Sequence, residues 1–202
     1  MLQVRIHGRG GQGVVTAAEV LSVAGFLGGR HALAFPSFGS ERMGAPVTAY
    51  CRIDTARIAT YEPVDDPDVL VVADPTLLHV LDAIAGLVPG GLVLLNTSKK
   101  PSELGLAGSK WPVVSVPATE IGQRHTGRPL PNGVLLGALA GLCAEQALSW
   151  PGAGVVSLRA VELALEQRFA PEVAAGNIAA AREGFVAVQR HFSDDSADAA
   201  HA

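Results

Sequence analysis

Over the first two thirds of the chain, the pattern of apolar and polar residues switches between the period of a strand and the period of a helix. Residues 2–6 alternate with a period of two, and residues 14–26 carry apolar side chains at helical spacing. Residues 69–73 form a wholly apolar run, which is typical of a parallel strand buried on both faces. Further strands are expected at residues 31–35, 47–53, 57–60, 90–95 and 112–116, with 47–53 and 57–60 pairing as a hairpin.

Helical patterns follow several of these strands and then dominate the end of the chain. Helices are expected at residues 77–87, 118–125, 133–147, 157–169 and 171–191, with Ser157 as an N-cap. Because strands alternate with helices, the sequence predicts an α/β fold: a mostly parallel sheet flanked by helices, with a Rossmann-like start and a helical C-terminal layer. We expect one domain over residues 1–192 and a disordered acidic tail over residues 193–202.

Composition and charge exclude several classes of protein. The chain of 202 residues is 49% hydrophobic and 17% charged, which favours a folded chain over a disordered one. Its net charge is -4 and its basic residues are scattered, so nucleic acid is not an expected partner. Its apolar runs are too short to span a membrane, and the start lacks the pattern of a signal peptide. We therefore expect no membrane contact and a cytoplasmic location.

Cysteine and histidine spacing gives no sign of a metal or redox centre within this chain. Cys51 and Cys143 lie far apart inside apolar runs, so no disulfide framework or cysteine cluster site is expected. The histidines show no metal-ligand spacing, and we interpret them as packing or surface residues: His7, His31, His79 and His125. A Gly-x-Ser-x-Gly nucleophile motif is also missing from the sequence, which argues against a hydrolase.

A glycine-rich turn separates the first expected strand from the first expected helix. Its residues, which have the Gly-x-Gly-x-x-Gly spacing of dinucleotide-binding turns, are Gly8, Arg9, Gly10, Gly11, Gln12 and Gly13. A dinucleotide site also needs an acidic residue after the second strand, where this chain has Pro36, so NAD binding is disfavoured. Two interpretations stay open: a turn that faces an anion or a partner loop, and a turn that only lets the helix pack closely on the sheet.

A long loop over residues 36–46 is the second candidate functional segment. It is expected at the carboxyl edge of the sheet beside the glycine-rich turn, where open α/β sheets bind ligands. Its candidate residues, which include two opposite charges, are Ser37, Gly39, Glu41, Arg42 and Gly44. The alternative is a surface ion pair that contributes little to stability.

Polar residues follow other strands at the same edge. Asp74 and Pro75 follow one buried strand, Asn96 and Thr97 follow the next, and Asn132 begins a later helix. We expect these residues to gather near one another, where they either bind a ligand or, as is commoner, cap helices.

These segments resemble the gamma family of pyruvate/2-ketoisovalerate ferredoxin oxidoreductases. Residues 8–13 look like its glycine-glycine-glutamine-glycine opening, and residues 38–44 resemble its aromatic-glycine-proline-glutamate-x-arginine-glycine loop, with Ser40 in place of the usual proline. Residues 69–74, 90–96, 117–121 and 132–137 resemble later blocks of the family, as does Asn177 in its closing helix. The resemblance covers about residues 1–190.

The resemblance implies a role inside a larger enzyme that oxidatively decarboxylates a 2-oxoacid with coenzyme A and passes electrons to ferredoxin or a similar acceptor. Thiamine diphosphate, Mg and [4Fe-4S] clusters would lie in partner subunits of the alpha, beta and delta types. This chain would dock against the thiamine-binding subunits and wall the channel for substrate or coenzyme A. Arg9, Arg42 and Lys99 are candidates for pairing with a carboxylate or phosphate, while Asn96, Thr97 and Asn132 would line the same edge.

Three other hypotheses remain open at this point. The first is the beta-type subunit of indolepyruvate oxidoreductase, whose loop resembles residues 40–44 less well. The second is a free-standing nucleotide-binding module that uses the glycine-rich turn. The third is a purely structural subunit whose loops never meet substrate. The identity of the 2-oxoacid, the choice between ferredoxin and NAD as acceptor, and the stoichiometry also stay open.

Overall fold

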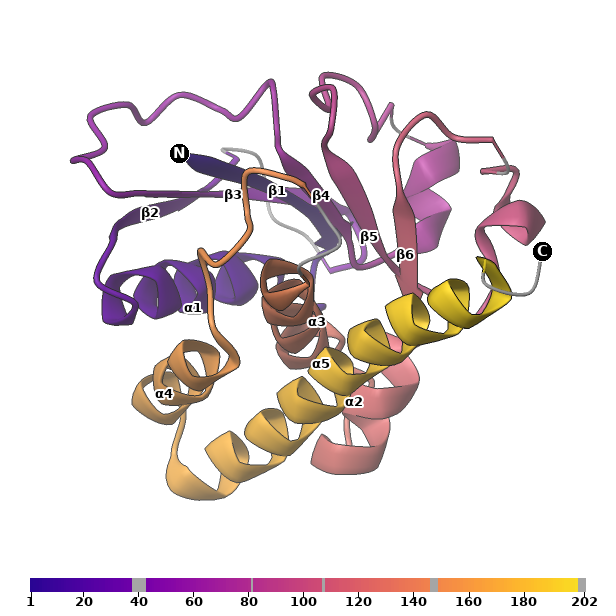
Figure 1. The fold of residues 1–202 in the computed structure, drawn as a ribbon. Coiled ribbons are helices and arrows are strands. Elements are labelled where there is room, and N and C mark those ends of the chain that lie inside the picture. The colour runs from indigo at the N-terminus through magenta and orange to yellow at the C-terminus, as the bar shows by residue number, and fades with distance from the viewer. Residues whose placement is uncertain (38–42, 81, 107, 146–148, 200–202) are drawn as a thin grey trace.

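A computed structural model gives the fold of the chain. It describes residues 1–37, 43–80, 82–106, 108–145 and 149–199, and for residues 194–199 it describes the backbone alone. Within these residues the sheet has six strands, in the order β2-β3-β1-β4-β5-β6 (Figure 1). Their bounds are β1 Leu2–Arg9, β2 His31–Pro36, β3 Pro46–Asp54, β4 Val69–Val72, β5 Leu92–Asn96 and β6 Val113–Val116.

The sheet is mixed, with its longest strand, β3, paired on both sides. Strands β1, β4, β5 and β6 run parallel, whereas β3 pairs antiparallel with β1 on one side and with β2 on the other. The expected mostly parallel α/β sheet is therefore confirmed. The expected hairpin between residues 47–53 and 57–60 is wrong, because both edges of β3 are already occupied.

Helices gather on one face of the sheet, which matches the expected helical C-terminal layer (Figure 1). They are α1 Val14–Leu27, α2 Ala118–Thr126, α3 Asn132–Ala144, α4 Leu158–Arg168 and α5 Pro171–Ala199. Helix α3 is apolar all round and 11 of its residues are buried, as a central helix between other layers requires. The predicted cap of α4 is confirmed, since Ser157 Oγ accepts a hydrogen bond of 3.2 Å from the Ala160 amide.

Close contact between α3 and α5 depends on small residues. A Cβ added to Gly137 would lie 1.8 Å from the Ala181 carbonyl oxygen, and one added to Gly184 would lie 2.2 Å from the Val134 carbonyl oxygen. The glycines therefore let the two helix backbones approach at a distance that larger residues exclude. The main apolar core fills the space between these helices and the sheet.

Two 3-10 helices and irregular segments cover much of the other face: η1 Pro75–His79 and η2 Pro101–Leu104. Two buried arginines hold these segments. Arg5 on β1 donates hydrogen bonds to the carbonyls of residues 64, 65, 83 and 85. Arg52 on β3 donates to the carbonyls of Glu62, at 2.7 Å, and Pro63, at 3.1 Å. The guanidinium groups satisfy carbonyls that irregular backbone leaves unpaired.

Arg5 explains one further error of the sequence prediction. In place of the helix expected at residues 77–87, the described residues form the end of a short 3-10 helix at 77–79 and tight turns at 83–86. The carbonyls of Ala83 and Ala85 accept from Arg5, and the Leu87 amide bonds the nearer Ile84 carbonyl at 3.1 Å. At the C-terminus, α5 continues to Ala199, so the helix extends beyond the expected domain end at residue 192. The division into a domain and a tail stays a prediction.

Candidate functional site

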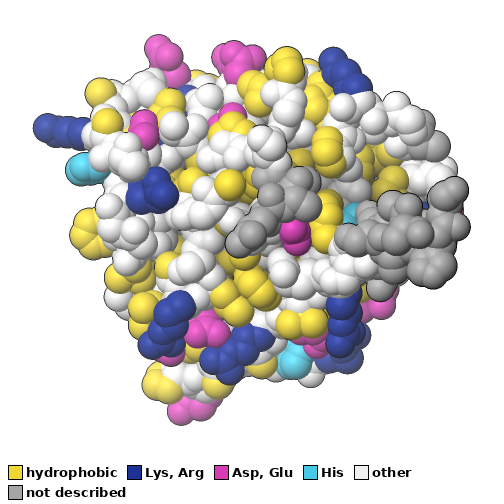
Figure 2. Space-filling view, in the orientation of Figure 1, with side chains coloured by type: hydrophobic (Ala, Val, Ile, Leu, Met, Phe, Trp, Pro, Cys, Tyr) yellow, Lys and Arg dark blue, Asp and Glu magenta, His cyan; other side chains and the backbone are white. Residues whose placement is uncertain are grey.

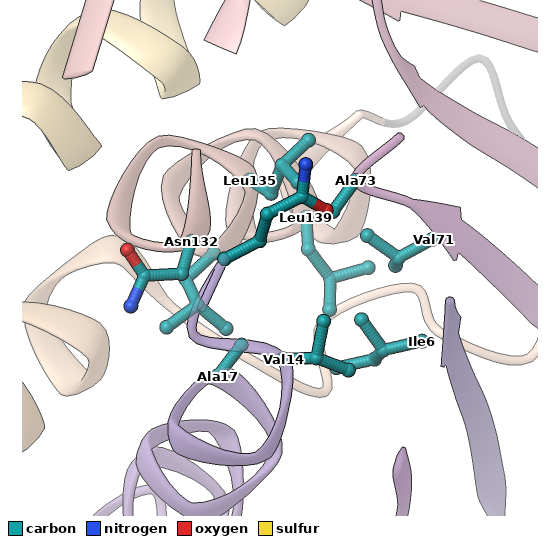
Figure 3. Close-up of a pocket in the computed structure, with 10 residues that line it drawn as sticks. Ile6, Val14, Ala17, Val71, Ala73, Asn132, Leu135 and Leu139 are labelled. Atoms are coloured by element: carbon teal, nitrogen blue, oxygen red, sulfur yellow. The ribbon is translucent and has the colours of Figure 1, made fainter. Parts of the chain in front are cut away.

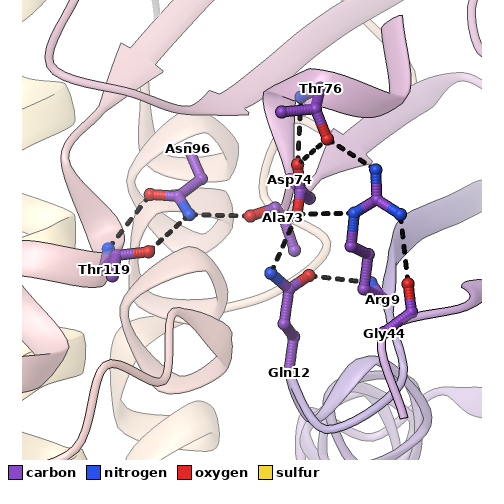
Figure 4. Close-up of polar contacts among 8 residues, drawn as sticks. All are labelled: Arg9, Gln12, Gly44, Ala73, Asp74, Thr76, Asn96 and Thr119. Atoms are coloured by element: carbon purple, nitrogen blue, oxygen red, sulfur yellow. Dashed lines mark hydrogen bonds and ion pairs between the residues drawn. The ribbon is translucent and has the colours of Figure 1, made fainter. Parts of the chain in front are cut away.

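The carboxyl edge of the parallel strands carries a dense group of hydrogen bonds, centred on Arg9 and Asp74 (Figure 4). Arg9 Nε lies 3.0 Å from Asp74 Oδ2. The same guanidinium donates to the Gly44 carbonyl at 3.0 Å and to Thr76 Oγ1 at 2.7 Å. Three of the five N–H groups of Arg9 therefore bond acceptors inside the chain, so this side chain fixes local structure.

Gln12 closes the glycine-rich turn from within. Its Oε1 accepts a 2.7 Å hydrogen bond from the Arg9 amide, and its Nε2 donates to Asp74 Oδ2 at 3.2 Å (Figure 4). A Cβ on Gly8 would lie 3.0 Å from that Oε1 and 2.4 Å from Val14 Cγ2. The side chain of Gln12 thus bonds the turn's own backbone, which favours the close-packing interpretation of the glycines over a dinucleotide cradle.

Asp74 is the centre of this network and remains ionised. Burial disfavours its charged form, but hydrogen bonds from Thr76 and Gln12 and the charge of Arg9 outweigh burial and lower the pKa of the carboxyl. Asp74 also caps η1, since its carboxylate accepts from the Thr76 amide at 3.0 Å. The capping role expected for Asp74 is therefore confirmed.

Asn96, at the end of the next strand, also bonds neighbouring elements at this edge. Its Nδ2 donates to the Ala73 carbonyl at 2.7 Å and to Thr119 Oγ1 at 2.8 Å, and its Oδ1 accepts from the Thr119 amide at 3.0 Å (Figure 4). The buried amide joins the ends of β4 and β5 to the start of α2. Thr97 contributes through its amide, which donates to the Val116 carbonyl at 2.9 Å, and its Oγ1 accepts from the Lys99 amide.

The loop after β2 is held at both ends. The Ser37 amide donates to the Thr48 carbonyl at 2.8 Å, and the Gly44 amide donates to the Gly10 carbonyl at 3.1 Å. The second bond places the Gly44 end of the loop beside the glycine-rich turn, as the sequence predicts, while the first holds Ser37 against β3. Three candidate residues of this loop, Gly39, Glu41 and Arg42, lie outside the described residues.

Asn132 lies against the start of α1. Gly13 has a left-handed backbone, with φ of 73°, and a Cβ there would lie 2.6 Å from Asn132 Nδ2. Gly11 is also left-handed, and the Met43 side chain packs over it, 2.9 Å from where a Cβ would lie. The expected gathering of the residues after β4 and β5 with Asn132 near one edge is confirmed, although Asn132 faces the helices.

His7 is buried on β1, as the packing interpretation of this histidine expects. Its Nδ1 lies 3.1 Å from Thr48 Oγ1, and its Nε2 is buried without a partner among the described residues. Burial, assisted by the nearby charge of Arg5, lowers the pKa of His7 to about 4. The imidazole is therefore neutral at pH 7.

The described residues do not form a site that fits a metal or an iron-sulfur cluster. Over those parts of the chain, His, Cys, Asp and Glu nowhere assemble in groups of three or more suited to a metal ion. Cys51 and Cys143 are both buried, and burial raises the pKa of each thiol, that of Cys143 to about 12. A cavity lined by Ile6, Val14 and Leu139 has only about 10 Å³, room for one water at most (Figure 3).

The described residues on the face drawn in Figure 2 form no basic stripe of the kind that binds nucleic acid. On the face shown in Figure 2, the described Lys and Arg side chains are dispersed among acidic, apolar and other residues. Within the described residues, no helix is both long and apolar enough to cross a membrane.

The geometry defines an α/β domain whose glycine-rich turn is closed by its own side chains. A family model for pyruvate ferredoxin/flavodoxin oxidoreductases matches residues 3–187. The chain belongs to that family.

Individual relatives agree with this assignment. The chain is 43% identical over 187 residues to the common gamma subunit of pyruvate/ketoisovalerate oxidoreductases from Thermococcus litoralis, covering 92% of this chain and 96% of the relative. It is 47% identical over 145 residues to pyruvate synthase subunit PorC from Methanosarcina barkeri, covering 72% and 79%. The crystal structure of pyruvate oxidoreductase subunit PORC from Thermotoga maritima matches with a TM-score of 0.77 and 35% identity, covering 92% and 95%.

Sequence reasoning left two residues of this network out of the candidate site. Thr76 bridges Asp74 and Arg9, and Thr119 completes the hydrogen bonds of Asn96. The position of each threonine, in the first turn after a parallel strand, was a signal in the sequence, because a threonine there can bond a neighbouring strand end. That position does not tell which residue the threonine bonds, since this depends on the order of the strands.

Proposed function

We propose that this chain is the gamma-type subunit of a multi-subunit 2-oxoacid:ferredoxin oxidoreductase. Such an enzyme decarboxylates a 2-oxoacid oxidatively with coenzyme A and passes the electrons to ferredoxin or a similar acceptor. The observation that carries the proposal is similarity to gamma and PorC subunits over nearly the whole length of the chain and of its relatives.

Within that enzyme the chain would support a reaction centre held by other subunits. Alpha, beta and delta-type partners would hold thiamine diphosphate, Mg and the [4Fe-4S] clusters, and the cofactors would carry out the carbanion and electron chemistry. The two buried cysteines, which lie on different elements of the core, do not fit a cluster site. The enzyme would work in the cytoplasm.

The carboxyl edge is our candidate for the surface that meets the partners and walls the path of substrate or coenzyme A. The Arg9, Gln12 and Asp74 network makes this edge rigid before assembly. One large apolar side chain projects from it, that of Met43, with 86% of its surface exposed. A rigid polar rim with projecting apolar side chains is typical of a protein interface.

Affinity purification of the tagged full-length chain from its source cell tests the assignment. Thiamine-diphosphate-binding and cysteine-rich subunits should co-purify, and the complex should show the broad visible absorption of iron-sulfur clusters. Turnover with pyruvate and with 2-ketoisovalerate, each with coenzyme A, would then identify the 2-oxoacid. A colourless chain without partners would contradict the proposal and favour a free-standing nucleotide-binding module.

A matched pair of variants tests which edge docks. Met43→Glu places a charge on the carboxyl edge and should lower recovery of the partner subunits by about tenfold or more, because an unpaired charge in an interface is costly. Tyr61→Glu places the same charge on a 71% exposed residue of the connection between β3 and β4, and should leave recovery unchanged. Equal recovery with Met43→Glu and with the wild type would place the interface elsewhere.

A further inference from the structure

A pocket separate from the carboxyl-edge network lies on the helical side of the glycine-rich turn. It has a volume of about 470 Å³, within the range of small-molecule sites. The starts of α1, α3 and α5 and the end of α2 line it, together with the connections at residues 128–130 and at Phe169. Four helices therefore meet at one hollow.

The backbone at this pocket has unused hydrogen-bond donors. The N-cap residues of α1 and α3 are Gly13 and Pro131, and neither supplies a side-chain cap. The first-turn amides of both helices are thus left without the acceptor that Ser, Thr, Asp or Asn supplies elsewhere. Gly11 and Gly13 also lie in the lining, where the Met43 side chain packs over Gly11 and the Asn132 side chain lies against Gly13.

Side chains on the pocket wall also have unused capacity. Arg128 is exposed and Asn132 half-buried, and in the described part of the chain neither side chain has a hydrogen-bond or ion-pair partner. Asn132 Oδ1 is fully buried, so the group of this side chain that can donate to an anion is its Nδ2 amide. The Thr16 hydroxyl, also in the lining, has no partner among the described residues.

The rest of the lining decides which kind of ligand fits. Leu130, Phe169 and Val173 form an apolar wall opposite these polar groups. Glu172 is the acidic residue of the lining, and its place in the first turn of α5 offsets part of its charge. His125 pairs with Glu183, which leaves Arg128 as the cation available to a ligand.

We propose that this pocket binds a small amphipathic anion. Its charged end, a carboxylate or a phosphate, would accept hydrogen bonds from Arg128 and the first-turn amides of α1, and its apolar part would lie against Leu130, Phe169 and Val173. The site is additional to the proposed subunit function and does not depend on it, because every group that forms it belongs to this chain.

Isothermal titration calorimetry of the full-length chain with three probes tests this site. Inorganic phosphate and hexanoate present the two anion types, and hexanamide keeps the apolar chain without the charge. At least one anion should bind at a single saturable site, and hexanamide should bind at least tenfold more weakly. Saturation by hexanoate alone identifies a carboxylic acid as the ligand class, and saturation by phosphate alone identifies a phosphate ester.

Three single-charge variants give the control. Arg128→Gln should weaken anion binding by about tenfold, and Glu172→Gln should strengthen it about threefold by removing the opposing charge. Lys110→Gln removes one positive charge beside Trp111, outside this pocket, and should bind like the wild type. The proposal is overturned if neither anion saturates the wild type, if hexanamide binds as well as the anions, or if Arg128→Gln and Lys110→Gln bind alike.

Discussion

Arg9 and Arg128 occupy two regions of the molecule that use the same side chain in opposite ways. At the carboxyl edge, Arg9 donates to Asp74, Gly44 and Thr76, so three of its five N–H groups are used inside the chain. In the helix pocket, Arg128 has no partner among the residues that the structure describes. The edge is already satisfied and presents a fixed shape, whereas the pocket has donors left for a ligand.

The difference separates two functions that a glycine-rich turn can have. On one side of the turn, Gln12 bonds the Arg9 amide and Asp74, so the turn supports a rigid surface. On its helical side, Gly11 and Gly13 line a pocket between helices. A sequence motif alone does not distinguish these sides, because the distinction depends on which side chains fold back over the turn.

The largest effect that we expect is a loss of stability at acid pH. It arises from protonation of His7, which is buried on β1. The pKa of His7 is about 4 in the folded chain against about 6.5 when unfolded, so the unfolded state binds the proton more readily. The free energy of unfolding should fall by about 3 kcal/mol between pH 6.5 and pH 4 on this account. Urea denaturation followed at a series of pH values measures it.

His7→Gln is the control for that prediction, since it removes the titrating group. The variant should be less stable than the wild type at pH 7, and its stability should vary less between pH 6.5 and pH 4. If the two proteins show the same slope against pH, other groups cause the loss.

The next effect concerns the carboxylate at the centre of the edge network. Asp74→Asn removes the partner charge of Arg9 and should lower the free energy of unfolding by about 2 kcal/mol at pH 7. Because the pKa of Asp74 is lowered, this contribution should be present above about pH 4 and be lost as the pH falls through the folded pKa. Urea denaturation at pH 7 and pH 3 measures the difference.

Glu19→Gln gives a matched control for Asp74→Asn. Glu19 pairs with Arg168 at 3.8 Å across a half-exposed surface, so its loss should change stability by less than about 0.5 kcal/mol. If the two variants lose equal stability, the network at the edge is no stronger than a surface ion pair.

Much of the fold could be predicted from the sequence because local pattern and burial agree. Apolar runs such as Val69–Val72 and the periodic residues of α1 give their elements directly. The pairing of β3 could not be found in this way, because alternation predicts a strand without naming its neighbours. The failure at residues 77–87 has a similar cause, since Arg5, 78 residues away from Ala83, takes a carbonyl that a helix would use.

The location of the candidate site could also be predicted from the sequence. The carboxyl edge and most of its residues follow from the strand ends and the turn, but the hydrogen-bond partners of each residue do not. Arg9 as a partner for a carboxylate or phosphate stays a prediction, and the structure adds three acceptors inside the chain that the sequence does not reveal. Of the helix pocket, Gly11, Gly13 and Asn132 were candidates from the sequence, but not the residues of 125–130 and 169–177 that meet them only in the folded chain.

The smallest stability effect gives the sharpest form of the comparison. Arg9→Gln removes a half-buried charge and leaves Asp74 without its cation, so it should lower the free energy of unfolding by about 1–2 kcal/mol. Arg128→Gln removes an exposed side chain without a partner in the described chain, so it should change that free energy by less than about 0.5 kcal/mol. Thermal and urea denaturation of both variants without added anion measure the pair. A loss at Arg128 as large as the loss at Arg9 would mean that Arg128 already serves the fold, and the distinction between a closed edge and an open pocket would then be wrong.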